Sequence, residues 1–582
     1  MRIVIGQGSC GIASGAKKTA IEFEKILGEH SLPYTPVPAG CIGLCYLEPI
    51  VDILDESGNV FRYVHITPDK VRKIVEYHLI KGEPVLEYLI PASGENFLNM
   101  QTRIALANCG IINPEDIQEY IAAGGYEGMK KALSMWSEAI CDEISASNLR
   151  GRGGGGFLAG TKWNQVRRQM EPVKYVVCNA DEGDPGAFMD RSIMEGDPHK
   201  MLEGMIIAGI ASGAQEGYIY VRAEYPLAVH RLRVAIKQAE EAGYLGKSIL
   251  GSDFSFSIKI NLGAGAFVCG EGSALTASIE GLRGMPRVKP PRTVEQGLFG
   301  KPTVLNNVET FANVPEIIVK SAEAFNQIGT PKNSGTKAFA LTGNVNNTGL
   351  IEVPMGTTLR RIIFEIGGGM KDGKKFKAVQ IGGPSGGCLT EEHLDLPLDF
   401  DSLTKVGAMI GSGGLVVMDE DTCMVSIARF FMNFTQHESC GKCVPCREGT
   451  HVMLELLDDI VNGDGTEETI EMLLELADTI SETSLCGLGK TAPSPVVSTI
   501  RQFPEEYLAH VRDKGCPAGQ CQAFKKLRII GELCRGCSLC ARVCPVEAIS
   551  GELKKPYVID QKKCIKCMAC VGSCKFGAIV VE

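Results

Sequence analysis

Cysteine spacing is the most informative chemical feature of this sequence. The chain contains 23 cysteines in 582 residues, and 14 of them follow residue 438. A disulfide framework is typical of short secreted chains, whereas this chain is long and its cysteines are concentrated toward one end. The pattern therefore favours metal or iron–sulfur ligation over disulfide bonds.

Two cysteine runs near the C-terminus repeat one spacing. CRGCSLCARVC (534–544) and CIKCMACVGSC (564–574) both have the pattern C-x2-C-x2-C-x3-C. Two-cluster ferredoxins have this pattern, and the fourth cysteine of each run binds the other cluster. A pair of zinc knuckles is the alternative, but zinc sites use four ligands in C-x2-C pairs rather than eight thiolates at this spacing. The predicted [4Fe–4S] ligand sets are Cys534, Cys537, Cys540 and Cys574, and Cys564, Cys567, Cys570 and Cys544.

A third cysteine set lies in HESCGKCVPCREGT. Cys440, Cys443 and Cys446 have C-x2-C-x2-C spacing, and the distant Cys486 in SLCGLG can complete the set. Four thiolates suit a further [4Fe–4S] cluster. A zinc ion bound by the same four cysteines is the alternative.

The N-terminal cysteines form an incomplete set. Cys10 stands alone, and Cys41 and Cys45 are separated by three residues. Three thiolates are one fewer than an all-cysteine [2Fe–2S] site needs. The favoured interpretation is a small structural domain that has lost its cluster, so the [2Fe–2S] cluster is doubtful.

A fourth group combines cysteines with a histidine. Cys423 precedes the expected helical region, and His510, Cys516 and Cys521 follow it. Three cysteines and one histidine would make a closed structural zinc site. Buried free thiols are an equally good interpretation.

Two glycine-rich segments and one acidic segment suggest a nucleotide or flavin site. RGRGGGGFLAGTKW (150–163) would let the backbone approach a phosphate or an isoalloxazine ring, with Lys162 adding positive charge. CNADEGDPGAFMDR (178–191) places carboxylates directly after a strand, and GAGAFVCGEGSALTASIEG (263–281) is a second glycine-rich turn that opens a helix. Neither glycine-rich segment is a Rossmann fingerprint or a P-loop.

The elements expected around these motifs change character along the chain. Strand-like runs such as YVVCNAD and GYIYVRAEY alternate with helical runs in the middle of the sequence, which indicates a layered α/β domain. The predicted domains are a small α/β unit at 1–80, a connector at 81–149, an α/β domain at 150–330, a β-grasp-like module at 335–425, a helical domain at 426–510, a linker at 511–530 and a ferredoxin-like domain at 531–582.

Composition excludes several classes of protein. The net charge is −10, and phosphate binding needs a basic face, so nucleic acid is not an expected partner. No apolar run approaches the roughly 18–20 residues that a membrane span needs, and MRIVIGQGSC resembles neither a secretory signal nor a transit peptide. We therefore expect a cytoplasmic protein without direct membrane insertion.

Five long motifs carry a resemblance to a known family: RGRGGGGF, NADEGDPG, GAGAFVCGE, PTVLNNVET and SCGKCVPCREG. Through them the chain resembles the NADH-binding FMN/iron–sulfur subunit of respiratory complex I. It is more similar still to the flavin-bearing subunit of electron-bifurcating hydrogenases and related soluble NAD(P)H:ferredoxin complexes. The resemblance covers nearly the whole chain. It implies a multidomain α/β and α+β fold with a thioredoxin-like N-terminal domain, an FMN/NAD(P)-binding domain, a ubiquitin-like (SLBB) module, a helical 4Fe–4S domain and a two-cluster ferredoxin domain.

The resemblance also implies roles for individual residues. Glu182 and Asp184 would orient the reactants rather than donate protons, the Cys440–Cys486 set would hold the cluster beside the flavin, and the Cys423 set would bind zinc. FMN would be held by Gly151, Gly153, Gly154, Lys162, Asn179, Asp181, Glu182, Asn306 and Asn307. Nicotinamide contacts would fall at Phe157, Asp184, Phe267, Glu271 and Lys289.

Three departures from the family pattern bear on specificity and cofactor content. Gly272 replaces the second glutamate of the family's GEETAL, and Arg292 replaces the aromatic residue of KPPF. Losing a carboxylate and gaining an arginine would favour the 2′-phosphate of NADP(H), which suggests NADP(H) use or dual specificity. Neutral drift with NAD retained is the alternative. In addition, the N-terminal domain usually has four cysteines and here has three.

The expected function is hydride exchange between a nicotinamide and FMN, followed by single-electron transfer through three [4Fe–4S] clusters. The resemblance implies the bifurcating or confurcating subunit of a complex with ferredoxin. A non-bifurcating NADH diaphorase subunit and a non-catalytic electron relay are the alternatives. Expected partners are a hydrogenase, formate dehydrogenase or similar module and a small thioredoxin-like ferredoxin subunit. No catalytic motif of those modules occurs in this sequence, so the chain alone should neither make hydrogen nor oxidise formate.

Overall fold

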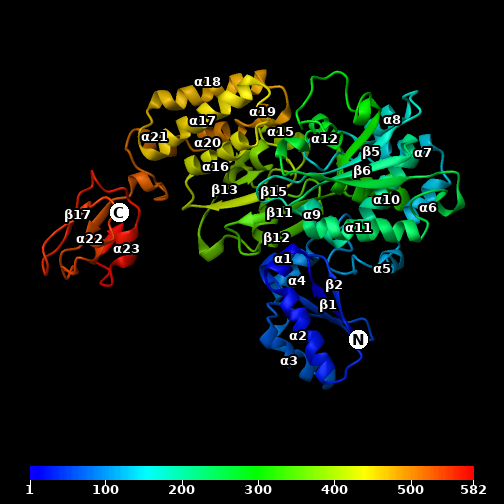
Figure 1. Cartoon of the computed structure of the whole chain (residues 1–582), viewed down its shortest axis with the longest axis horizontal. Helices are drawn as coiled ribbons and strands as arrows, with labels where there is room; N and C mark the ends of the chain where they lie inside the picture. Colours follow the sequence, from blue (N-terminus) through cyan, green and yellow to red (C-terminus); the bar gives the residue numbers. More distant parts are fainter. Residues whose placement is uncertain (582) are drawn as a thin grey trace.

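The computed structural model describes residues 1–581 as a central body with domains attached to it. Figure 1 shows the N-terminal domain in blue below the body, a layer of yellow helices above it and the red C-terminal domain at one side. Each of these attached domains has a buried hydrophobic cluster of its own.

The N-terminal domain is a small sheet covered by helices α2 (Ala16–Glu29) and α3 (Pro68–Ile74). Helix α2 buries Phe23, Ile26 and Leu27, as the helical spacing of its apolar residues dictates. The strand order is β2-β1-β3-β4, with β1 parallel to β2 and antiparallel to β3. The strands are β1 (Arg2–Gly6), β2 (Pro36–Ala39), β3 (Val51–Leu54) and β4 (Val60–Tyr63).

The central α/β domain is built on a parallel sheet of order β7-β6-β5-β8. Its strands are β5 (Tyr175–Ala180), β6 (Glu216–Arg222), β7 (Ser257–Gly263) and β8 (Thr303–Asn307). The chain moves outward from β5 to β7 and then returns to place β8 on the other side of β5. This reversal is the switch point at which open α/β sheets bind ligands, beyond the carboxyl ends of their strands.

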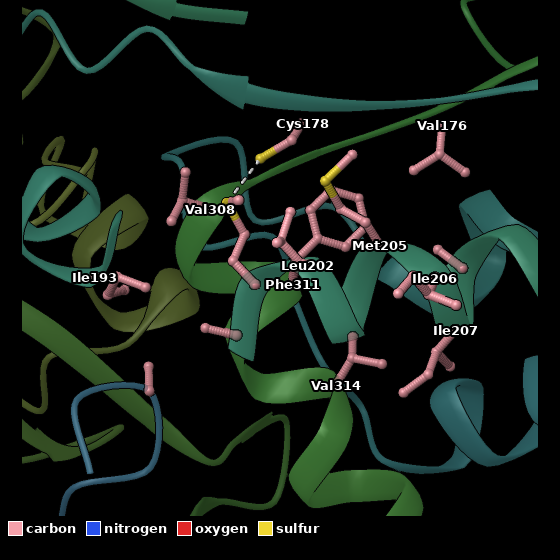
Figure 2. Close-up of a cluster of buried hydrophobic side chains, with 14 of the residues drawn as sticks. Val176, Cys178, Ile193, Leu202, Met205, Ile206, Ile207, Val308, Phe311 and Val314 are labelled. Carbon is pink, nitrogen blue, oxygen red and sulfur yellow. Dashed lines mark hydrogen bonds between the residues drawn. The ribbon is translucent and has the colours of Figure 1, made fainter. Parts of the chain in front are cut away.

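A fully buried helix forms the centre of this domain. Helix α10 (Pro198–Ser212) is buried along nearly its whole length and packs between β5, α6 (Glu127–Leu133) and α13 (Val308–Lys320). Figure 2 shows Leu202 and Met205 of α10 close to Cys178 of β5 and to Phe311 and Val314 of α13. The remaining helices of the domain are α7 (Ser137–Ala146), α8 (Ala159–Arg167), α9 (Met189–Gly196), α11 (Pro226–Glu241) and α12 (Gly272–Ile279).

The segment between the N-terminal domain and the glycine-rich loop packs into the same core. Helices α4 (Ala92–Asn99) and α5 (Ile117–Ala122) precede α6 and α7. Leu106, Met129 and Ile140 are fully buried in the core of the central domain. The segment therefore contributes apolar surface to the central domain besides joining two parts of the chain.

The β-grasp module is a five-stranded mixed sheet of order β12-β11-β15-β13-β14. Its strands are β11 (Thr336–Gly343), β12 (Gly349–Pro354), β13 (Phe376–Ile381), β14 (Gly387–Leu389) and β15 (Gly414–Asp419). The segment TTLRRIIFEIG forms a π-helical turn at Arg361–Ile366, and α15 (Phe400–Lys405) precedes β15. Ile42 and Leu44 of the N-terminal domain join the core of this module.

The last two domains are a helical bundle and a compact unit of short strands. The bundle contains α16 (Met424–His437), α17 (Val444–Asn462), α18 (Glu467–Thr483), α19 (Gly487–Thr491), α20 (Ser494–Gln502) and α21 (Pro504–Val511). The C-terminal unit pairs β16 (Leu527–Ile529) with β19 (Ile579–Val581) and β17 (Ile549–Ser550) with β18 (Val558–Ile559), and contains α22 (Leu539–Arg542) and α23 (Ala569–Ser573). Among residues 1–581, no helix has the length and apolar character that a membrane crossing requires.

Candidate functional site

An open cleft lies at the switch point of the central sheet. Asn179 at the end of β5 is paired in register with Asn307 at the end of β8. The acidic segment follows β5 directly, so the strand ends deliver its carboxylates to the cleft. Clefts at such switch points of α/β sheets are common sites for cofactors and other small molecules.

The structure brings together most of the residues expected at a flavin and nicotinamide site. Those lining the cleft are Gly153, Gly154, Asn179, Asp181, Glu182, Asp184, Phe267, Glu271 and Asn307. Those outside its lining are Gly151, Phe157, Lys162, Gly272, Lys289, Arg292 and Asn306.

Two walls of the cleft come from distant parts of the chain that the motifs did not indicate. The β-grasp module contributes Gly382, Met409 and Ser412, and the helical domain contributes Gly487 and Leu488. Only tertiary structure brings these residues to the sheet. The one signal in the sequence was that Gly487 follows Cys486, a predicted cluster ligand.

Arg152 anchors the glycine-rich loop. Its backbone N–H donates to Thr310 Oγ1 at 2.9 Å, and its buried guanidinium donates to the carbonyls of Ser334 at 2.7 Å and Thr336 at 2.9 Å. A Cβ at Gly153 would lie only 3.1 Å from the side chain of Asn307. The loop is thus fixed to α13 and to the β-grasp module, while its glycines keep the cleft open.

Unpartnered polar atoms lie at the ends of β5 and β8. Asp181 Oδ2 and Asn306 Nδ2 are buried and have no hydrogen-bond partner among residues 1–581. Burial raises the pKa of Asp181 to about 7. An unsatisfied acceptor in the cleft and an unsatisfied donor next to it are what a polar ligand such as a flavin can satisfy, so the residues present fit FMN.

Glu182 and Asp184 have different surroundings. Both oxygens of Glu182 accept hydrogen bonds from the first turn of α9, from Asp190 N–H and Arg191 N–H at 3.0 Å each. Asp184 accepts a hydrogen bond from Ser412 of the β-grasp module. Burial raises the pKa of Asp184 to about 6. Glu182 therefore fixes a helix terminus, whereas Asp184 links the two domains across the cleft.

The charged residues on the α12 side also have protein partners. Glu271 is the N-cap of α12, accepts hydrogen bonds from Ser273 N–H at 2.9 Å and Ala274 N–H at 3.0 Å, and pairs with Lys289 Nζ at 2.6 Å. Lys162 Nζ donates to the carbonyl of Leu305 at 2.5 Å. Burial lowers the pKa of Lys162 to about 8. These contacts place positive charge behind β8 and fix the start of α12.

The two positions that depart from the family pattern lie at and after α12. Gly272 is the first residue of the helix, and a Cβ there would be 3.5 Å from its nearest neighbour, Leu305. Arg292 is half exposed and its NH2 pairs with Glu295 Oε1 at 2.7 Å. Phe157, in the glycine-rich loop, is also half exposed.

The third cysteine set (Cys440, Cys443, Cys446 and Cys486) lies near the N-termini of helices α17 and α19, beside the cleft. Cys443 is the N-cap of α17, Cys446 lies in its first turn and Cys486 is the N-cap of α19. Burial, followed by the charges of Cys443, Cys486 and Cys440, raises the pKa of Cys446 to about 11. Helix α19 thus carries Cys486 at its start and contributes Gly487 and Leu488 to the cleft.

The C-terminal domain contains two cavities that match the two cysteine sets. One cavity is lined by Cys534, Cys537, Cys540 and Cys574. The other is lined by Cys544, Cys564, Cys567 and Cys570. The fourth cysteine of each run therefore lies with the first three of the other run.

Cys423, His510, Cys516 and Cys521 form a tight group, with all four ligand atoms within 4.8 Å of one another. Cys423 Sγ lies 3.5 Å from His510 Nε2 and 3.6 Å from Cys521 Sγ. The other ring nitrogen of His510, Nδ1, lies 2.7 Å from the carbonyl oxygen of Glu506. A backbone carbonyl at this position orients a histidine that ligates metal.

Family models match four parts of the chain. They are the Nuo51 FMN-binding domain at 144–316, the SLBB domain at 339–389, the NADH-ubiquinone oxidoreductase-F iron-sulfur binding region at 426–510 and the 4Fe-4S dicluster domain at 533–579.

Relatives extend the match over most of the chain. NADP-reducing hydrogenase subunit HndC of Solidesulfovibrio fructosivorans is 54% identical over 482 residues, which cover 83% of this chain and 98% of the relative. The NADH-quinone oxidoreductase-F subunit of Aquifex aeolicus (strain VF5) is 46% identical over 67% of this chain and 90% of the relative. The chain belongs to the NADH-quinone oxidoreductase-F family. The resemblance found in the sequence is thereby confirmed, as is the multidomain fold class.

Family membership defines the chemistry at a coarse level. The chain is an FMN- and iron–sulfur-containing NAD(P)H oxidoreductase subunit with [4Fe–4S] domains. A crystal structure of an NAD+-reducing [NiFe]-hydrogenase in the air-oxidized state superposes with a TM-score of 0.63 and 28% identity, covering 88% of this chain and 85% of that one.

Proposed function

We propose that the cleft binds FMN and a nicotinamide, and that electrons leave it through the Cys440–Cys486 cluster. The observation that carries this proposal is the double role of α19, which begins at Cys486 and forms part of the cleft wall. FMN, when bound, supplies the step between two-electron hydride chemistry and one-electron cluster chemistry. A non-catalytic electron relay would not need a cleft that binds a cofactor, so the cleft argues against that alternative.

The residues around the cleft act by binding and orienting. Gly153 and Gly154 keep the backbone open to the cofactor, and Asp181 and Asn306 offer it an acceptor and a donor. Glu182 fixes the start of α9, and Asp184 holds the β-grasp wall through Ser412.

We further propose that the chain is the electron-splitting subunit of a complex with a hydrogenase-type module and ferredoxin. The relative named an NADP-reducing hydrogenase subunit supports the hydrogenase part. The two cysteine-lined cavities of the C-terminal domain support a second electron branch, with three [4Fe–4S] clusters in the chain. The Cys423 group would bind zinc.

Gly272 and Arg292 would adapt the nicotinamide site to NADP(H). Position 272 has room for a side chain, so its lack of a carboxylate is not forced by packing. The Arg292–Glu295 pair is exposed, and such pairs contribute little free energy. Arg292 can therefore exchange this partner for a 2′-phosphate.

An anaerobic titration tests the site and its specificity together. The reconstituted chain is titrated with NADH and, separately, with NADPH while flavin absorbance is followed. We expect bleaching by NADPH at lower concentration, and we expect G272E to weaken the NADPH response at least tenfold. The isosteric G272Q isolates the effect of charge and should change the NADPH response much less. Bleaching by NADH alone would contradict the NADP assignment, and a chain that takes up no flavin would contradict the proposed site.

A further inference from the structure

A buried carboxylate lies next to the three-cysteine group of the N-terminal domain. Cys10 follows β1, Cys41 follows β2, and Cys45 lies four residues after Cys41. Because β1 and β2 are parallel, their carboxyl ends meet at the same edge of the sheet and bring the thiols together. Glu48, three residues after Cys45, points a carboxylate oxygen, Oε1, at Cys10 Sγ at 3.7 Å.

The spacing within this group fits ligands around a single ion. The three thiol sulfurs lie within 4.8 Å of one another, and Cys41 Sγ is 3.8 Å from Cys45 Sγ. Zinc–sulfur bonds of about 2.3 Å and zinc–oxygen bonds of about 2.0 Å place tetrahedral ligands about 3.8 Å apart for two sulfurs and about 3.5 Å apart for a sulfur and an oxygen. The Cys41–Cys45 separation matches the first value, and the Cys10–Glu48 separation of 3.7 Å is close to the second, although no one Glu48 oxygen lies within 4.8 Å of all three sulfurs.

The same comparison argues against a binuclear cluster here. In a [2Fe–2S] site the four ligands are divided between two irons, so ligands on different irons are separated by an additional iron–iron distance. Among residues 1–581, the tight groups are this one and the Cys423 group, and none of the twelve cysteines expected at [4Fe–4S] clusters belongs to a tight group. The N-terminal group therefore resembles the single-ion set and not the cluster sets.

Glu48 is held beside Cys10, at the edge of the thiol group. Its carboxylate is 7% exposed, and Oε2 accepts a hydrogen bond from Ile50 N–H at 3.0 Å, which leaves Oε1 toward the thiols. Position 6 is a glycine, and a Cβ there would lie 3.3 Å from Glu48 Oε2. The space beside the thiols is thus filled by this carboxylate.

The loops of this group also form the docking surface of the domain. Ser9 N–H donates to Glu195 Oε2 at 2.8 Å, and Gly40 lies against Gly196 so closely that a Cβ there would be 2.3 Å from its Cα. Glu195 and Gly196 end α9, whose first turn is fixed by Glu182 of the cleft. An ion at this position would fix the loops that hold the domain against α9.

We propose that Cys10, Cys41 and Cys45 bind one zinc-type divalent ion, that the adjacent Glu48 carboxylate moves onto it as the fourth ligand, and that this ion stabilises docking of the N-terminal domain onto α9. The site is independent of the flavin and of the [4Fe–4S] clusters. The ion has no redox chemistry, so the N-terminal domain would be a structural part of the subunit and not an electron carrier.

Metal content of the full chain, purified anaerobically, tests the proposal. We expect C41S to lower zinc by one ion per chain and to leave iron unchanged. C388S, which removes a buried thiol remote from the group, should leave both metals unchanged. Unchanged zinc in C41S would overturn the proposal, as would loss of two irons together with the spectroscopic signal of a reduced [2Fe–2S] cluster.

A second measurement covers the case in which C41S fails to fold. The E48Q chain keeps all three thiols, and we expect it to lose zinc to a chelator at least tenfold faster than the wild-type chain. Both chains carry C423S, so that the other tight group does not contribute zinc. Equal rates in the two chains would show that Glu48 is not a ligand and would overturn the four-ligand site.

Discussion

At the scale of single residues, Asp181 combines burial, an unpartnered oxygen and a raised pKa. Burial raises its pKa to about 7 from a usual value of 3.8. A carboxylic acid with a raised pKa in the folded state holds its proton more tightly than in the unfolded chain. Stability therefore falls as pH rises from 3.8 to about 7, and the loss is complete above the folded-state pKa.

Replacing Asp181 should remove this penalty. In the flavin-free chain, we expect D181N to melt about 3–8 °C above wild type at pH 8, equivalent to about 1–2 kcal/mol, and the gap to narrow at pH 5.5. Thermal melting at the two pH values measures it. D253N, at an exposed aspartate, is the control and should melt at the same temperature as wild type at either pH. If the difference in melting temperature between D181N and wild type did not depend on pH, the explanation from the raised pKa of Asp181 would be contradicted.

Sequence motifs reveal the roles of some residues, whereas the roles of others can be seen only in the structure. Cysteine spacing predicted both crossed sets of the C-terminal domain, because a fixed spacing constrains which thiols can meet. Motifs also located Glu182, but not its contact with the start of α9. Arg152 was missed as an anchor, since its partners Ser334 and Thr336 lie about 180 residues away.

At the scale of elements, the sequence predicted strands that are continuously apolar, such as β5 and β6, but not the proline-containing strand β2. YVVCNAD and GYIYVRAEY correspond to β5 and β6, which are buried central strands. Strand β2 was missed because its sequence is PVPA, and proline is depleted in strands. It occurs here because β2 is an edge strand, where a missing N–H removes no ladder bond.

One buried ion pair joins β11 of the β-grasp module to α13 of the central domain. Lys337 of β11 pairs with Glu309 of α13, and both side chains are almost fully buried. Glu309 Oε1 also accepts a hydrogen bond from Ala338 N–H at 2.8 Å. Because removing one partner leaves a buried charge unpaired, we expect K337M to destabilise the chain by about 3–5 kcal/mol.

The double variant distinguishes charge from packing. K337M/E309Q leaves no buried charge at this pair and keeps an acceptor for Ala338, so it should recover much of the stability that K337M loses. Denaturant unfolding followed by fluorescence measures both. If the double variant were less stable than K337M alone, the loss would come from packing and the electrostatic account would be wrong.

At the scale of the whole molecule, the C-terminal domain is attached through a narrow connection. It has its own hydrophobic cluster, and Figure 1 shows it at one side of the body. Hydrogen bonds near the connection run from Gln522 Nε2 to the carbonyl of Lys566 at 2.7 Å and from Lys566 Nζ to the carbonyl of Ala523. Little buried surface of the body therefore depends on this domain.

A chain that ends at Lys526 should keep flavin reduction and lose a branch of electron transfer. We expect the iron content to fall by about eight atoms per chain, because two cubane clusters are removed. The rate of nicotinamide-dependent flavin bleaching should stay within about twofold of that of the full chain, because the cleft and the Cys440–Cys486 set lie entirely before the cut. Ferredoxin reduction by the assembled complex should fall at least tenfold. The full-length C540S chain, which removes one ligand and keeps the domain, separates loss of a cluster from loss of a docking surface. If the truncated chain reduced ferredoxin as fast as the full chain, the electron path would leave from the Cys440–Cys486 cluster and the C-terminal branch would be contradicted.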